Sequence, residues 1–137
     1  MQHCLAYGVR PSLLDSHQHV HTIWPIYERV ARFAAEQAVP LRLARNLGGN
    51  IGPAKRLFKM LLNQRLRRPC AEPVCTPADL RDQPLPAQGT LEVIVHLCAL
   101  GEDFGDDHLD AEESLSALLD RCLAGVPRIA YSALTEL

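Results

Sequence analysis

The chain has 137 residues, 47% of them hydrophobic and 22% charged, which indicates one folded domain rather than a disordered segment. No stretch reaches the roughly 18 apolar residues of a membrane span, and the first residues lack the apolar core of a signal peptide, so we expect a cytoplasmic protein that does not enter a membrane. The net charge is −2, but residues 1–68 carry 11 basic and 3 acidic side chains while residues 69–137 carry 3 and 13. This asymmetry indicates either contact with an anionic partner or two oppositely charged faces that meet or are solvated.

The five cysteines form no CxxC pair, and their number is odd. This pattern argues against a secreted disulfide framework and against a zinc ribbon. We therefore expect reduced thiols, with a redox pair of Cys70 and Cys75 as the alternative.

Residues 14–21, LDSHQHVH, place polar side chains at every second position: Asp15, His17, His19 and His21. A period of two is typical of a strand, so we expect all four on one strand face. A lone buried histidine is usually a hydrogen-bonded core residue, whereas three on one face with an aspartate would need many partners. The pattern predicts a metal site or a polar active site.

A helix and a second strand follow the histidines. Thr22 and Pro25 are typical of a helix start, and apolar side chains recur at helical spacing over residues 26–37. Residues 41–45 alternate again as a strand after Val39-Pro40 ends the helix. Strand, helix and strand form a βαβ unit with parallel strands, and sites in such sheets collect at the carboxyl ends of the strands.

The middle of the chain is less regular. The glycine-rich residues 46–53 favour a connecting turn over a phosphate site, because no GK[ST] follows. A basic helix is predicted next, over residues 53–68, and a proline-rich irregular segment over residues 69–87. The helix carries six positive charges without an acid, at Lys55, Arg56, Lys59, Arg65, Arg67 and Arg68.

The last third predicts a strand, a loop, a helix and a strand. Residues 90–96 form a third strand that ends on His96, and the acidic loop GEDFGDDHLD follows. A helix is predicted from Asp110, which with Glu113 has the spacing of a capping box, and residues 128–132 are expected to form a fourth strand. The predicted class is α/β, with a mainly parallel sheet built from βαβ units.

These residue types favour hydrolysis at a divalent metal. Neutral imidazoles bind zinc and related metals, and a hydrolytic site keeps a position for water, which the metal activates for attack on a carbonyl carbon. Asp15 can orient an imidazole or act as the base. His96, expected at the same edge of the sheet, can act as the general acid for the leaving group.

DSHQHVH, followed by IYERVARFAAEQAVP and LRLARN, resembles the YdjC-like carbohydrate deacetylases, whose best-known members are chitooligosaccharide deacetylases. The resemblance resumes at GTLEVIVH and LLDRCLAGVPRIAYSAL, and covers roughly residues 8–65 and 88–137. It implies a partial (β/α) barrel-like fold, with residues 1–137 as a single domain from the C-terminal portion of the family's barrel. It also implies removal of N-acetyl groups from amino-sugar oligosaccharides with a divalent metal, Mg or Zn.

The resemblance implies that His17 is a metal ligand, that His19 and Arg42 contact substrate, and that His21 or His96 helps the amine leave. The family's other metal ligands lie in DDFG-type and GxH-type motifs without counterparts here, so we interpret the chain as N-terminally truncated. A homo-oligomer or a complementing N-terminal fragment would supply the missing ligands and cover exposed strand edges.

Two other functions stay open. One is a catalytically inactive remnant that retains a sugar-binding or metal-binding site. The other is a binder of nucleic acid or an anionic surface through residues 55–68, which we do not expect because Phe58 is the only aromatic residue among these charges. Steep loss of affinity with salt would identify such a binder, whereas deacetylation would depend on metal.

Overall fold

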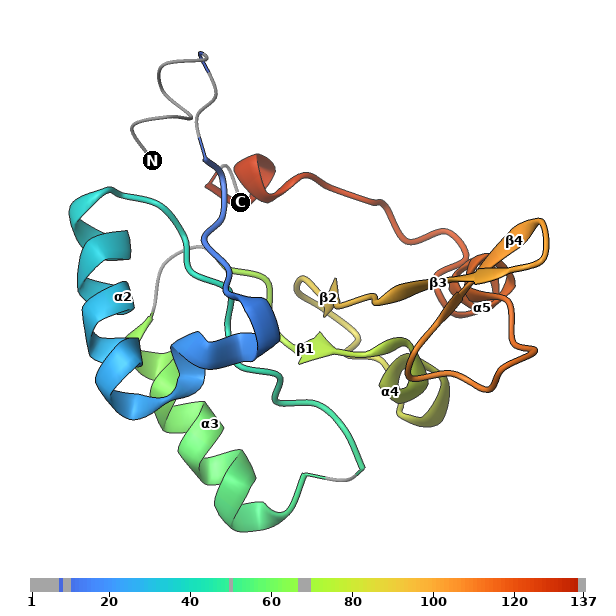
Figure 1. Ribbon diagram of the computed structural model, residues 1–137, viewed down its shortest axis with the longest axis horizontal. Coiled ribbons are helices and arrows are strands. Elements are labelled where there is room, and N and C mark those ends of the chain that lie inside the picture. The colour runs from blue at the N-terminus through green and yellow to red at the C-terminus, as the bar shows by residue number, and fades with distance from the viewer. Residues whose placement is uncertain (1–7, 9–10, 50, 67–69, 136–137) are drawn as a thin grey trace. The chain divides into compact units, whose positions relative to one another are not determined.

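The computed structural model describes residues 8, 11–49, 51–66 and 70–135, apart from the side chains of His17, Gln18 and Thr135 (Figure 1). The chain divides into two compact units. Unit 1 consists of Met1–Ala44, Met60–Ala71 and Ile129–Leu137, and unit 2 consists of Arg45–Lys59 and Glu72–Arg128.

Unit 1 contains one helix and the end of a second, as the periodicity predicts. Helix α2 spans Trp24–Glu36, with Pro25 in its first turn, and α3 spans Pro53–Arg65, with its last six residues in this unit. Tyr27 of α2 is buried, and its hydroxyl donates a 2.7 Å hydrogen bond to the carbonyl of Leu62 in α3. Both helix predictions are confirmed over the described residues, with the second helix ending at Arg65; residues 67 and 68 of that prediction lie outside the described residues.

The expected strand over the histidine run is wrong from residue 17 onward. A parallel bridge joins Leu14 to Leu41, as the βαβ prediction requires, but His17–Thr22 then form a 3-10 helix, η1. Local bonds replace the strand ladder: the backbone N–H of His19 donates to the Ser16 carbonyl, and the Thr22 hydroxyl donates to the His19 carbonyl. Because the backbone is satisfied within the segment, it needs no neighbouring strand over these residues.

The strands expected over residues 41–45 and 128–132 are also mostly absent from the described backbone. Only Leu41 of the first takes part in a bridge, because both backbone groups of Ala44 pair with the Asn63 side chain in place of a strand. The second region leads into a 3-10 helix, η2, over Tyr131–Thr135, in which the N–H of Ala133 donates to the carbonyl of Ala130.

Unit 2 contains a short pair of parallel strands. One strand lies inside the proline-rich segment 69–87 that was expected to be irregular, and the other follows that segment. Strand β1, Val74–Cys75, pairs with β2, Glu92–Val93, and helix α4 spans Pro77–Asp82. Thr76 caps α4 in a capping box with Asp79. The proline density did not exclude a helix, because Pro77 stands at its start, where a missing N–H costs nothing. The strand predicted over residues 90–96 is present, but it is reduced to β2.

The acidic loop predicted over residues 101–110 is instead half of an antiparallel hairpin. Strand β3, Leu97–Leu100, pairs with β4, Asp103–Asp106, across a two-residue turn. Gly101 begins this turn with φ +59°, a conformation that glycine adopts without strain. Helix α5, Leu115–Cys122, follows, and its cap is Ser114 rather than the predicted capping box.

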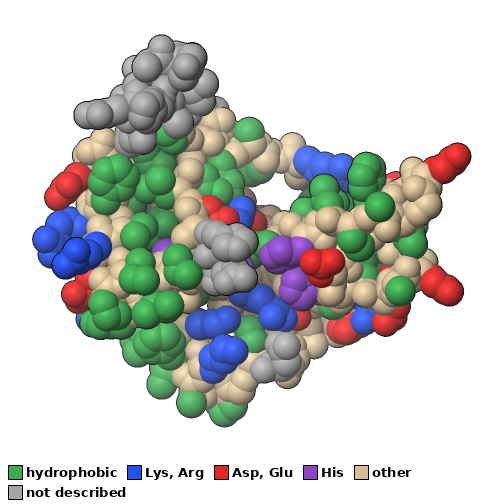
Figure 2. All heavy atoms as spheres, viewed as in Figure 1, with side chains coloured by type: hydrophobic (Ala, Val, Ile, Leu, Met, Phe, Trp, Pro, Cys, Tyr) green, Lys and Arg blue, Asp and Glu red, His purple; other side chains and the backbone are tan. Residues whose placement is uncertain are grey.

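The architecture is thus mixed α/β, with one parallel and one antiparallel two-stranded sheet among the described residues and no closed barrel there. The barrel-like fold and the single domain stay predictions. Large hydrophobic side chains of α2 and α3 are exposed, and Figure 2 shows them in green. No helix among the described residues combines the length and apolar character needed to cross a membrane.

Candidate functional site

Three of the predicted site residues come together in unit 1. Asp15, His19 and His21 each offer a ligand atom, and these atoms lie within 4.8 Å of one another. We call this group the N-terminal cluster. It contains the residue types that bind zinc and related divalent metals.

The 3-10 helix shapes the N-terminal cluster. His19 has φ +56°, a left-handed conformation that is uncommon outside glycine and enriched in histidine. Ser16 holds His21 twice: its hydroxyl oxygen accepts a 3.0 Å hydrogen bond from the His21 N–H and lies 2.5 Å from the ring Nδ1. The His21 ring therefore has a fixed orientation.

His21 is the buried member of the cluster, with 1% of its surface exposed. Its Nε2 is buried and has no hydrogen-bond partner among the described residues. Burial lowers the pKa of His21, against the opposing effect of the Asp15 carboxylate. A neutral imidazole with an unsatisfied buried nitrogen is suited to bind a metal or a substrate, because such a nitrogen is costly without a partner.

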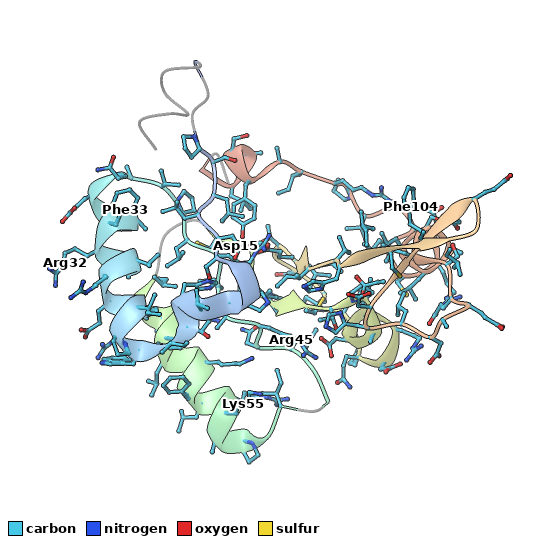
Figure 3. All side chains as sticks on the ribbon, in the orientation of Figure 1. Asp15, Arg32, Phe33, Arg45, Lys55 and Phe104 are labelled. Atoms are coloured by element: carbon cyan, nitrogen blue, oxygen red, sulfur yellow. The ribbon has the colours of Figure 1, made fainter. Side chains whose placement is uncertain are left out.

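Arg42 lies beside the same cluster. Its Nη1 donates to Oδ2 of Asp15, while Oδ1 of Asp15 lies 3.9 Å from Nδ1 of His21. Asp15, labelled in Figure 3, thus stands between a guanidinium and an imidazole. The pairing with Arg42 orients one carboxylate oxygen, and the other lies near the His21 ring.

The remaining predicted site residues are His17 and His96. The side chain of His17, the expected metal ligand, lies outside the described residues. His96 belongs to unit 2, where it groups with Asp106 and His108, whose ligand atoms also lie within 4.8 Å of one another. We call this second group the hairpin cluster. The catalytic and binding roles predicted for these residues stay predictions.

Sequence reasoning missed Ser16, Asp106 and His108. The signal for the last two was present: a D-x-H spacing, Asp106-Asp107-His108, follows a strand that ends on a histidine. We interpreted it only as part of an acidic loop. Ser16 had no comparable signal, since its contacts with His21 depend on the 3-10 helix.

One curated relative supports the resemblance over part of the chain. The sequence is 48% identical over 46 residues to a chitooligosaccharide deacetylase of Klebsiella pneumoniae (strain 342). The match spans 34% of this chain and 18% of that deacetylase. No family model matches the chain, and no solved structure matches it.

Proposed function

We propose that the chain is a metal-dependent carbohydrate deacetylase of the YdjC-like type, which hydrolyses N-acetyl groups of amino sugars such as chitooligosaccharides. The observation that carries this proposal is the 46-residue match to a chitooligosaccharide deacetylase. The partial (β/α) barrel that the resemblance implies belongs to the same proposal.

The N-terminal cluster fits a divalent metal. It joins a carboxylate and two imidazoles, and the buried Nε2 of His21 has no partner among the described residues. We propose that His17 binds the ion beside this cluster, and that the ion is Mg or Zn. Such an ion supplies polarisation of the acetamide carbonyl and an activated water.

The protein's own side chains would orient the reaction and move its protons. Arg42 fixes one oxygen of Asp15, which leaves the other facing His21, where it can accept a proton during the attack. Because His21 is neutral at rest, it first gains the proton that Asp15 accepts, and the lowered pKa of His21 then favours transfer of that proton to the leaving amine. Ser16 keeps the His21 ring in place for this transfer.

The resemblance assigns only His17 among the family's metal ligands to this chain. We therefore propose that a second copy of the chain, or a separate N-terminal fragment, contributes the others. The alternative is a catalytically inactive remnant that binds sugar or metal.

The test is acetate release from N,N′-diacetylchitobiose by the purified chain, with added zinc or magnesium and with a chelator. We expect metal-dependent release that His17→Ala abolishes and that His21→Gln lowers by about 10²–10⁴-fold, the usual contribution of a general acid. Gln37→Ala, at the exposed end of α2, is the control and should keep full activity. A folded protein without any acetate release would favour the remnant.

A further inference from the structure

We propose that the β3–β4 hairpin carries a metal site of its own, in which His96, Asp106 and His108 bind one first-row transition ion such as Zn²⁺. All three ligands belong to unit 2 and to one continuous segment of thirteen residues, 96–108. The inference is therefore independent of the proposed deacetylase function.

The strand register brings the three residues together. Asp106 pairs with Leu97, so that His96 immediately precedes the paired residue on the opposite strand. The N–H of Asp107 donates to the carbonyl of His96 at 3.2 Å and extends the pairing by one step. A turn closed by the N–H of Leu109 and the carbonyl of Asp106 then returns His108 to the carboxylate.

The Asp106 carboxylate is held by the two histidines. Its side chain is 0% exposed. Oδ2 accepts a 2.5 Å hydrogen bond from the backbone N–H of His96, and Oδ1 accepts one of 2.9 Å from that of His108. The backbone of each proposed imidazole ligand thus fixes one oxygen of the proposed carboxylate ligand, which is the preorganisation that a metal site requires.

One separation equals that of two ligands on the same metal ion, and it is also the length of a hydrogen bond. With metal–ligand bonds of about 2.05 Å, two adjacent ligand atoms are about 2.9 Å apart at 90° and about 3.3 Å apart at the tetrahedral angle. Oδ1 of Asp106 and Nδ1 of His108 are 3.0 Å apart. The His96 and His108 rings are tilted by 49° with centroids 4.8 Å apart, and both side chains are exposed, so small rotations can complete the site.

The surrounding charge favours a cation. Residues 101–110 contain five acidic side chains and no lysine or arginine. Arg81 reaches this region, but its guanidinium pairs with Asp82, Glu113 and Asp110, and the ion-pair partner of Asp106 is His108. A buried carboxylate is costly without a compensating charge, which a bound cation would provide.

The ligand set selects the class of metal. Two imidazoles and one carboxylate suit Zn²⁺, Co²⁺ or Ni²⁺, whereas Mg²⁺ and Ca²⁺ prefer oxygen ligands. This role for His96 differs from the general acid predicted from the sequence, so the two can be separated by experiment.

The test is calorimetric titration of the chelator-stripped full chain with Zn²⁺, with NMR of the histidine imidazoles as a second readout. To prevent Zn²⁺ from binding at the N-terminal cluster, every protein in this test would also carry His19→Ala and His21→Ala. We expect one equivalent of Zn²⁺ to bind and to shift the resonances of His96 and His108. Asp106→Asn should weaken this binding by more than about 100-fold, because even outer-shell partners cost 10–100-fold.

The matched control is Asp107→Asn, which removes the same charge from the adjacent exposed position and should leave Zn²⁺ affinity within a few-fold. His108→Gln, at an exposed side chain, repeats the test if Asp106→Asn does not fold. Equal affinities for the ligand variants and Asp107→Asn would overturn the proposal, and so would Zn²⁺-induced shifts that do not include His96 and His108. Acetate release is measured separately, so either proposal can fail alone.

Discussion

Replacing Asn63 by alanine should unfold unit 1 at markedly lower denaturant concentration. Asn63 is 5% exposed, and its side chain pairs with both backbone groups of Ala44, accepting from the N–H at 2.8 Å and donating to the carbonyl at 3.0 Å. Ala44 is itself buried. Asn63→Ala would leave these two groups without partners, at about 1–3 kcal/mol each, so we expect a loss of about 2–6 kcal/mol.

Urea unfolding followed by tryptophan fluorescence measures this loss. Trp24 is the only tryptophan, lies in the same unit as Asn63, and stacks on Tyr27 with ring centroids 6.0 Å apart. With an m-value of roughly 2 kcal/mol/M, the midpoint should fall by roughly 1–3 M while m stays constant.

Two variants distinguish hydrogen bonding from packing. Asn63→Leu keeps the branched shape of the side chain and fills the space with a larger apolar group, but it leaves Ala44 unpaired, so it should lose nearly as much stability as Asn63→Ala. Gln64→Ala, at the exposed neighbouring position, should stay within about 0.5 kcal/mol of wild type. A midpoint for Asn63→Ala equal to that of Gln64→Ala would refute the reasoning, and recovery in Asn63→Leu would assign the effect to a cavity.

Two further predictions concern titration and thiol reactivity in unit 2. Burial raises the pKa of Asp79, but hydrogen bonds led by those from Arg45 outweigh it and lower this pKa overall. The stability that Asp79 contributes is thus fully present above the ordinary aspartate pKa, and it is lost as the pH falls through the lowered pKa. Asp79→Asn should therefore flatten the acid side of a plot of urea midpoint against pH. An unchanged slope would contradict this. Burial raises the pKa of the Cys75 thiol to about 12, whereas Cys98 is exposed. Iodoacetamide at pH 7.5 should therefore modify Cys98 in the native chain and spare Cys75. Peptide mass spectrometry measures the modification at each cysteine.

The two long helices could be predicted because their signals are local. The apolar spacing over residues 26–37 and Pro53 at a helix start are properties of the helix itself, and both α2 and α3 form where they are expected. Helix α4 was missed because five prolines in residues 69–87 outweighed the pair Thr76-Pro77, which is a helix start.

The histidine run shows why alternation alone does not predict a strand. A half-buried strand needs apolar side chains on its inner face, but the positions between the predicted ligands are Ser16, Gln18 and Val20, of which only one is apolar. The segment therefore gains little by extending. Hydrogen bonds to the Ser16 hydroxyl oxygen and from the Thr22 hydroxyl stabilise η1 instead, and Asp15, His19 and His21 still come together.

The hairpin cluster was hidden because its ligands are about ten residues apart in the sequence. Only the register that follows from the turn at Gly101 brings His96 to Asp106. Once that turn is recognised, antiparallel pairing places the two residues together without any long-range information.

Both clusters are thus assembled by short chain closures, a 3-10 helix in one unit and a two-residue turn in the other. Neither needs the other unit to bring its ligands together. We therefore expect Asp106→Asn to weaken Zn²⁺ binding at the hairpin cluster by the same factor whether the N-terminal cluster is intact or carries His19→Ala and His21→Ala. A factor that differs between these two backgrounds would contradict the independence of the two clusters.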